Sequence, residues 1–205
     1  MNRADAAGEV LVPFPFARAR VPMATHIRST MITSSLSTLK ALGLFDAYVA
    51  NLTQVHRDVL PMTVAGFWLP IEQGIAHYEA CDKLRLLPNE LLSMGEGVGI
   101  QSQESALSLA LKLAAGSGVT PWTVLSQSRR FWDRAFKGSG VAVFKLGPKE
   151  ARFEIVGWPL ARIDYNRISF RGILVSLARP FCTKVYVTEI AGYTSTTVSY
   201  RVAWA

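Results

Sequence analysis

The sequence predicts an α+β protein in which a helical part precedes an antiparallel sheet. Apolar residues recur with the 3.6-residue period of helices over residues 23–138 and with the two-residue period of strands over residues 141–204. Helices that are separated along the chain from antiparallel strands are typical of α+β folds. We expect about six helices, followed by a β-β-α-β-β segment that forms a four-stranded antiparallel sheet.

Proline, glycine and hydroxyl residues divide the helical part. The first three helices are expected over 25–42, 44–60 and 63–86, and proline or glycine ends or interrupts each of them. The fourth begins at Asn89 and is expected to be short, since three glycines at alternate positions weaken it: Gly95, Gly97 and Gly99.

Two further helices are expected before the sheet. The fifth runs over about 102–116. The sixth begins at Thr120, a hydroxyl N-cap, with Pro121 at the first helical position, and it ends before Gly138.

The sheet part contains two hairpins around one helix. The first hairpin covers residues 141–156, and the helix follows over 166–179. The second hairpin pairs residues 184–190 with residues 196–204. Apolar and polar residues alternate in its last strand, so we expect Trp204 to be buried although it is the penultimate residue.

Length and composition are those of one folded domain. The chain has 205 residues, of which 50% are apolar and 18% are charged, so it is long enough to bury a core and too apolar to be disordered. We expect residues 1–20 to form a partly disordered leader and residues 21–205 to form a single domain. The sequence shows no signal peptide and no apolar run of the roughly 18 residues that a membrane span needs, so a cytoplasmic location is expected.

The sequence contains no catalytic or metal-binding motif. A catalytic nucleophile needs a base and an orienting group, and a structural zinc site needs four ligands. Among three histidines and two cysteines, only His77 and Cys81 lie one helical turn apart. The basic residues that produce the net charge of +7 are scattered. We therefore expect no enzymatic activity, metal, cofactor or nucleic-acid partner.

Aromatic and apolar residues of the expected helices are the candidates for lining a ligand cavity. Such a stripe is typical of a core and equally typical of an apolar pocket, and the sequence does not separate the two. Arg167 and Arg171 lie one turn apart and could bind an anionic head group, or they could form surface ion pairs with Asp164 or Glu189. The candidate lining residues are Phe67, Trp68, Ile71, Tyr78, Leu107, Leu111, Trp132 and Phe136.

The last third of the chain carries motifs that resemble those of a known family. They lie at 153–159, at Tyr165 with 170–172, and at 200–204. Over roughly residues 20–204 the chain resembles a large paralogous family of uncharacterised myxobacterial proteins. That family resembles a wider fold group of haem-nitric-oxide-binding sensor domains, four-vinyl-reductase-type effector-binding domains and TRAPP vesicle-tethering subunits.

The resemblance implies a closed apolar cavity between helices and sheet, filled by haem, a small aromatic, a fatty acyl chain or side chains alone. Haem-sensing members have an axial histidine shortly before the sheet and a Tyr-x-Ser-x-Arg motif. Here no histidine follows His77, and Tyr165-Asn166-Arg167 departs from that motif although Tyr165 and Arg167 lie near the corresponding place. We therefore expect no haem.

The expected function is a non-enzymatic sensor or scaffold domain that binds an apolar small molecule or acyl chain. The alternative is a ligand-free protein–protein interaction module that acts as a homodimer or with another protein. The ligand-binding residues implied near the sheet helix are Tyr165, Arg167 and Arg171.

Overall fold

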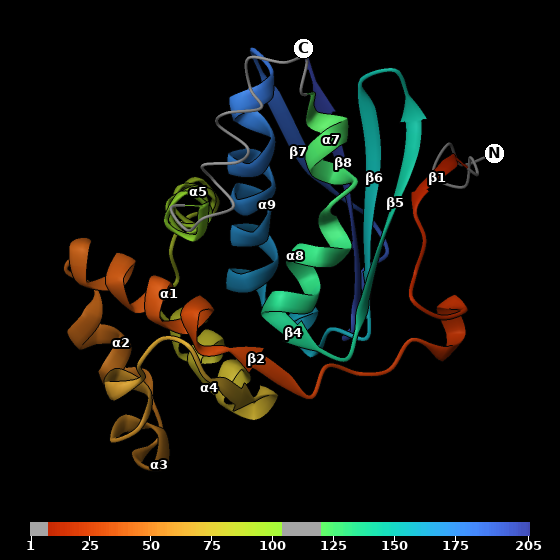
Figure 1. Cartoon of the computed structure of the whole chain (residues 1–205). Helices are drawn as coiled ribbons and strands as arrows, with labels where there is room; N and C mark the ends of the chain where they lie inside the picture. The colour runs from red at the N-terminus through yellow and green to blue at the C-terminus, as the bar shows by residue number, and fades with distance from the viewer. Residues whose placement is uncertain (1–7, 104–119) are drawn as a thin grey trace.

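The computed structural model describes residues 8–103 and 120–205, which form an α+β fold with helices on one side of the main sheet (Figure 1). The predicted α+β class is confirmed. The described α-helices are α1 (Ser29–Ala41), α2 (Phe45–Asn51), α3 (Gln54–Arg57), α4 (Ile71–Asp82), α5 (Pro88–Gln103), α7 (Pro121–Leu125), α8 (Ser128–Ala135) and α9 (Asp164–Ala178).

The main sheet has five antiparallel strands in the order β1-β5-β6-β8-β7. The prediction of a four-stranded sheet is wrong by one strand, because part of the expected leader pairs with β5, Glu9 opposite Lys145 and Val10 opposite Phe144. This pairing satisfies the backbone groups of β5 that would otherwise form an open edge. The strands are β1 (Glu9–Val12), β5 (Gly140–Gly147), β6 (Glu150–Val156), β7 (Val185–Ile190) and β8 (Thr197–Trp204).

A second sheet of three short antiparallel strands joins distant parts of the helical half, in the order β3-β2-β4. It consists of β2 (His26–Arg28), β3 (Trp68–Pro70) and β4 (Phe136–Lys137). The sequence does not predict it, since strands of two or three residues are too short to show a period. For the same reason the expected helices over 25–42 and 63–86 begin too early.

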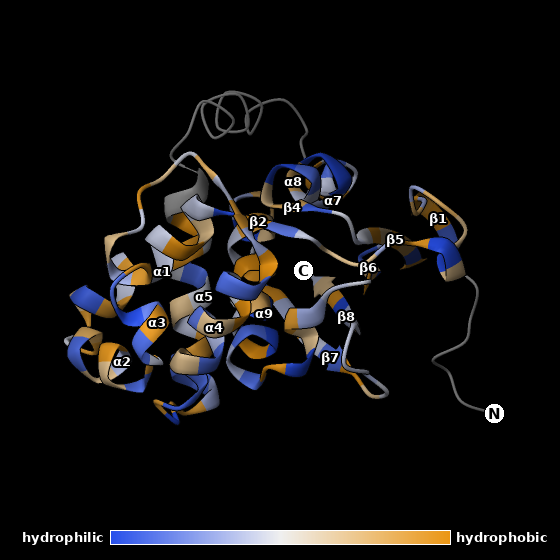
Figure 2. Cartoon of the chain, turned by 90° about the horizontal axis from the view of Figure 1, so that it is seen from below, coloured by the Kyte–Doolittle hydropathy of each residue, from blue (hydrophilic) through white to orange (hydrophobic). Residues whose placement is uncertain are grey.

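Helix α9 lies between the main sheet and the layer formed by α1, α4 and α5, as Figures 1 and 2 show from two directions. Helices α7 and α8 lie on the same side of the sheet as α9, and α5 packs along the outer side of α9 (Figure 2). None of the described helices is long and apolar enough to cross a membrane.

Helix α5 has 16 residues, so the expectation of a short, weakened helix is wrong. Its glycines allow α5 and α9 to approach closely. A Cβ atom added to Gly95 would clash with the carbonyl oxygen of Ser169, and one added to Gly172 would clash with that of Leu92. Close packing against α9 therefore offsets the low helix propensity of glycine.

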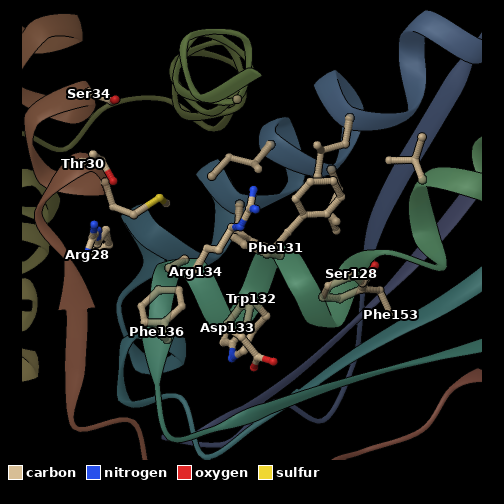
Figure 3. A pocket seen from close by; sticks show the side chains of 18 of the residues that line it. Arg28, Thr30, Ser34, Ser128, Phe131, Trp132, Asp133, Arg134, Phe136 and Phe153 are labelled. Atoms are coloured by element: carbon tan, nitrogen blue, oxygen red, sulfur yellow. The ribbon is translucent and has the colours of Figure 1, made fainter. Parts of the chain in front are cut away.

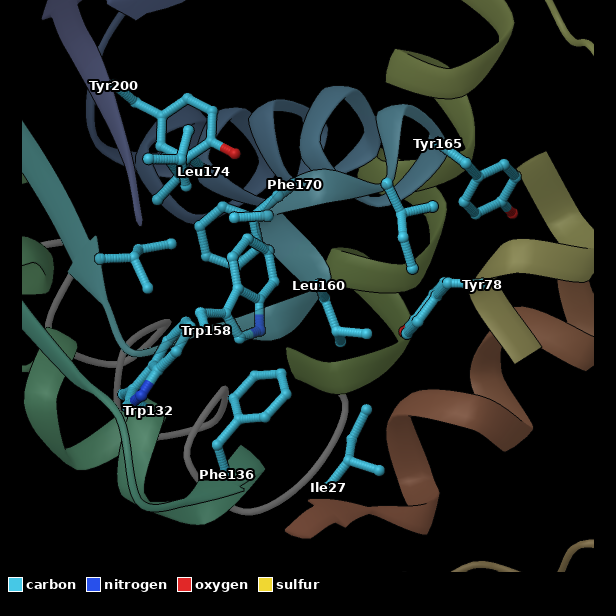
Figure 4. Close-up of a cluster of buried hydrophobic side chains, with 14 of the residues drawn as sticks. Ile27, Tyr78, Trp132, Phe136, Trp158, Leu160, Tyr165, Phe170, Leu174 and Tyr200 are labelled. Carbon is cyan, nitrogen blue, oxygen red and sulfur yellow. The ribbon is translucent and has the colours of Figure 1, made fainter. Parts of the chain in front are cut away.

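The core is centred on Trp158, which is almost fully buried (Figure 4). Its ring lies 5.6 Å from Trp132 and 5.3 Å from Phe170 between centroids, both edge-to-face. These aromatic contacts join α8, α9 and the loop after β6 into one unit. Trp204 is 8% exposed, which confirms the predicted phase of the last strand.

Candidate functional site

A cavity of about 730 Å³ lies between α1, α8 and α9 (Figure 3). Its buried wall consists of apolar side chains from α8, β4, the main sheet and α9. Its exposed edge includes Arg28, Thr30, Asp133 and Arg134, which are half-buried or exposed. The larger side chains of the buried wall are Trp132, Phe136, Phe153, Phe170 and Leu174.

Local sequence signals fix where α7 begins and where α8 ends, and so which residues reach the cavity. Thr120 is the N-cap of the preceding α7 and Pro121 its first residue, as predicted. On α8, Trp132 turns into the core and its indole N–H donates to the Ser139 hydroxyl at 2.9 Å. The chain leaves the helix at Phe136, which becomes part of β4 and stays on the buried wall.

Three predicted lining residues lie at the cavity: Trp68, Trp132 and Phe136. Two others, Ile71 and Tyr78, are buried in the core and do not line it. Phe67 is also not part of the lining and is 61% exposed. The remaining candidates, Leu107 and Leu111, lie outside the described residues.

The predicted arginine pair on α9 is engaged by other parts of the protein. Arg167 is 2.8 Å from both Asp164 and Glu189. Burial alone would lower the pKa of Arg167, but hydrogen bonds and charges from these two carboxylates raise it. Arg171 donates from Nε to the carbonyl of Val187 at 3.0 Å. These contacts favour the ion-pair alternative for Arg167, and neither arginine lines the cavity.

Tyr165 lies in a separate buried cluster formed by α1, α2, α4, α5 and α9. Its hydroxyl is 3.7 Å from the Met94 sulfur, and its ring lies 6.1 Å from that of Tyr78. In the same cluster, the ring of His77 is within hydrogen-bond distance of the Tyr48 hydroxyl at 2.8 Å and of the Ser35 hydroxyl at 3.0 Å.

Burial determines the titration of this cluster. It lowers the pKa of His77 to about 3, because the neutral imidazole is the cheaper form to bury. Burial also raises the pKa of the Cys81 thiol, so Cys81 stays protonated and is a poor nucleophile. In the described residues no group of three or more His, Cys, Asp or Glu is arranged to hold a metal ion.

Several lining residues were not predicted as such. Phe170, Ile173, Leu174 and Leu177 form the apolar stripe that predicts α9, and that stripe could have indicated the wall as well as the core. Arg28 and Arg134 gave no sequence signal, since they are 106 positions apart and meet the cavity only in the fold.

Solved structures that resemble this chain include H-NOX domains. The H-NOX protein from K. algicida, in its unliganded Fe(II) form, has a TM-score of 0.62 at 10% identity and covers 87% of this chain and 97% of that chain. An oxygen-binding H-NOX domain related to soluble guanylate cyclases has a TM-score of 0.58 at 12% identity, over 87% of this chain and 95% of that one.

A third structure, concerned with haem redox potential and protein-induced porphyrin distortion, has a TM-score of 0.57 at 12% identity, over 87% of this chain and 100% of that one. Together these likenesses show that the chain has the H-NOX fold. No protein-family model matches the chain, and no curated protein matches it. The resemblance to the myxobacterial family and to tethering subunits stays a prediction.

The residues at the cavity do not fit haem. All three histidines of the sequence lie elsewhere: His26 in β2, His56 in α3 and His77 in the buried cluster. Residues 104–119 contain no histidine, cysteine, tyrosine or methionine. Met31 is the one axial-ligand type among the described lining residues, and methionine serves haem iron as the partner of a histidine.

Proposed function

We propose that this chain is a non-enzymatic sensor domain that binds an apolar small molecule or an acyl chain in the cavity between α1, α8 and α9. The cavity is the observation that carries the proposal. Packed cores leave few voids larger than a water molecule. A cavity of about 730 Å³ with an aromatic wall instead has the size and lining of ligand pockets, which enclose roughly 300–1,000 Å³.

The structures with the same fold support a ligand-binding role. Their names describe an oxygen complex, an Fe(II) protein and a distorted porphyrin. Haem itself is not the proposed ligand, because no histidine reaches this cavity. An apolar molecule suits the wall better, since binding would remove apolar surface on both partners from water.

Mass spectrometry of the purified chain tests the proposal. Native spectra compared with denaturing spectra report a bound ligand, covalent acylation and the oligomeric state together. Titration with fatty acids and small aromatics should change tryptophan fluorescence, because Trp68 and Trp132 line the cavity. A ligand at about 100 times its dissociation constant should add about 2.7 kcal/mol to the free energy of unfolding.

A pair of matched variants distinguishes the cavity from other apolar surface. Leu177→Trp adds bulk at a half-buried lining position and should abolish the thermal shift that the ligand produces. Leu87→Trp makes the same change at a position that is 62% exposed and outside the lining, and it should keep the shift. If no member of a broad apolar library shifts the melting temperature and no ligand co-purifies, the sensor proposal fails.

An interaction module is the second candidate, and one segment favours it. Five large apolar side chains between residues 55 and 67 are exposed, among them Val55 at 78% and Met62 at 77%. Exposed apolar patches often mark protein interfaces, so a homodimer through this segment is the proposed alternative. Sedimentation should then show a dimer that Met62→Glu dissociates, whereas a monomer at all concentrations would exclude it.

A further inference from the structure

Two arginines line the cavity and have no anionic partner in the part of the chain that the structure describes. Arg28 ends β2 and is half-buried, and Arg134 lies on α8 and is exposed. Neither guanidinium forms a hydrogen bond or an ion pair within residues 8–103 and 120–205. Other arginines are paired, such as Arg162 with Glu79 at 2.8 Å. The described chain therefore leaves positive charge at the edge of an apolar cavity.

The three-stranded sheet positions part of this charge. Arg28 pairs in register with Trp68, and its guanidinium carbon lies 5.1 Å from the Trp68 ring centroid. The Lys137 ammonium lies 4.9 Å from the same ring. Cation–π contacts of this length hold a cation in place while its N–H groups stay available.

One carboxylate also lines the cavity. Asp133 follows Trp132 on α8 and is 3.7 Å from Arg129, four residues earlier on that helix. Figure 3 shows the Asp133 carboxylate and the Arg134 guanidinium extending from α8 in opposite directions, with Arg134 on the side of Phe131. Asp133 therefore pairs along the helix, and Arg134 has no carboxylate partner among the described residues.

We propose that the ligand is a single-chain amphiphile with an anionic head group, bound by Arg28 and Arg134 with its tail against the buried wall. This inference rests on the proposed function and specifies the class of its ligand. A neutral apolar molecule that covered the edge of the cavity would remove water from the Arg28 and Arg134 guanidinium groups and offer them no hydrogen-bond acceptor in its place. A guanidinium binds carboxylates and phosphates through two parallel N–H groups, so an anionic head group replaces the lost water directly.

Four probes with alkyl tails of nearly equal length separate the contribution of the head group from that of the tail. They are myristic acid, its methyl ester, tetradecanol and tetradecyl phosphate, each measured by titration calorimetry at low salt. The acid or the phosphate should bind about tenfold more tightly than the two neutral probes, and the difference should shrink as salt rises. The acid and the phosphate compared with each other identify the head group. Lengthening the tail should strengthen binding about fourfold for each buried methylene until the cavity is full.

Variants on one helix provide the matched comparison. Arg134→Gln should abolish the preference for charged over neutral probes, and Arg28→Lys should reduce it because the bidentate geometry is lost while the charge stays. Arg130→Gln removes an exposed arginine of α8 that does not line the cavity, and it should retain the full preference. Arg134 is exposed, so its replacement should leave the fold intact.

The outcomes separate this inference from the function on which it rests. If all four probes bind equally well, the cavity binds apolar tails and the head-group assignment is wrong. A preference that survives Arg134→Gln and Arg28→Lys also overturns the assignment. If no probe binds, the proposed sensor function fails with it.

Discussion

Trp204 is a buried aromatic residue of β8. Its ring lies 4.7 Å from that of Trp122 in an edge-to-face contact that joins β8 to α7. We predict that Trp204→Ala lowers the free energy of unfolding by about 3 kcal/mol, since it removes a buried aromatic and leaves a cavity. Urea denaturation measures the change. Tyr186→Ala on β7 is the control, because Tyr186 is 58% exposed, and it should cost much less.

His77 should make stability depend on pH. Its folded pKa of about 3 lies below the ordinary value of 6.5, so the unfolded chain binds a proton more readily between these values. The contribution of neutral His77 to the free energy of unfolding is therefore complete above pH 6.5 and is lost as the pH falls toward 3. We predict that the free energy of unfolding decreases in this window by up to about 1.4 kcal/mol for each pH unit.

Substitution isolates the contribution of His77 from that of the carboxylates. His77→Gln should flatten the acid slope and should also cost about 1–3 kcal/mol at pH 7, because the hydroxyl of Tyr48 loses its partner. Urea denaturation of both proteins across this pH window measures the slope. An acid slope that is the same in the native protein and in His77→Gln would contradict the assignment.

The close packing of α5 against α9 depends on the absence of a side chain at Gly95. Gly95→Ala should destabilise the protein, because the new methyl group would meet the backbone of Ser169, which cannot move independently of α9. A loss of about 2 kcal/mol is expected, within the range for overpacked sites. Thermal denaturation measures it.

Gly97 provides the internal control. In the described part of the chain, a Cβ atom at Gly97 meets nothing within 4 Å. Gly97→Ala should therefore stabilise α5 by about 0.5–1 kcal/mol through helix propensity alone. If both alanines had the same effect, the close approach of the two helices would be disproved.

The elements differ in how far the sequence could predict them. α9 and β8 each have a sustained apolar period, and the predicted ranges 166–179 and 196–204 correspond closely to them. The length of α5 was missed because its glycines are stabilised by packing against α9, a contact that local propensity does not report. β1 was missed because its pairing with β5 joins residues more than 130 positions apart.

Segments far apart in the sequence meet at the cavity, so only some of its lining residues could be predicted from the sequence. Trp132 and Phe136 could be identified as inward-facing from the apolar stripe that precedes the sheet. Arg28 reaches the cavity only because β2 pairs with β3 and β4, which come from segments far apart in the sequence. Tyr78 belongs to the same helical half as Trp68 but faces the cluster around His77, a choice that depends on packing and not on period.

This chain and the H-NOX domains share a fold, but the residues at the cavity of this chain do not fit haem. The chain has the H-NOX fold, yet none of its histidines lies at the cavity, and an iron held only by Met31 would lack its histidine partner. We predict that protein incubated with equimolar haem and passed through a desalting column shows no stoichiometric Soret band.

Phe131→His tests whether the lack of an axial histidine is the reason why the native chain is expected not to bind haem. Phe131 lines the cavity beside Arg134 (Figure 3), so the substitution places an imidazole where an axial ligand could act. A Soret band in this variant alone would show that the cavity admits the macrocycle and that coordination is what the native chain lacks. Absence of a band in both proteins would mean that the cavity also excludes haem by shape. A stoichiometric band in the native protein that disappears on substitution of His26, His56 or His77 would refute the prediction, because it would require one of these side chains to reach the iron from outside the cavity seen here.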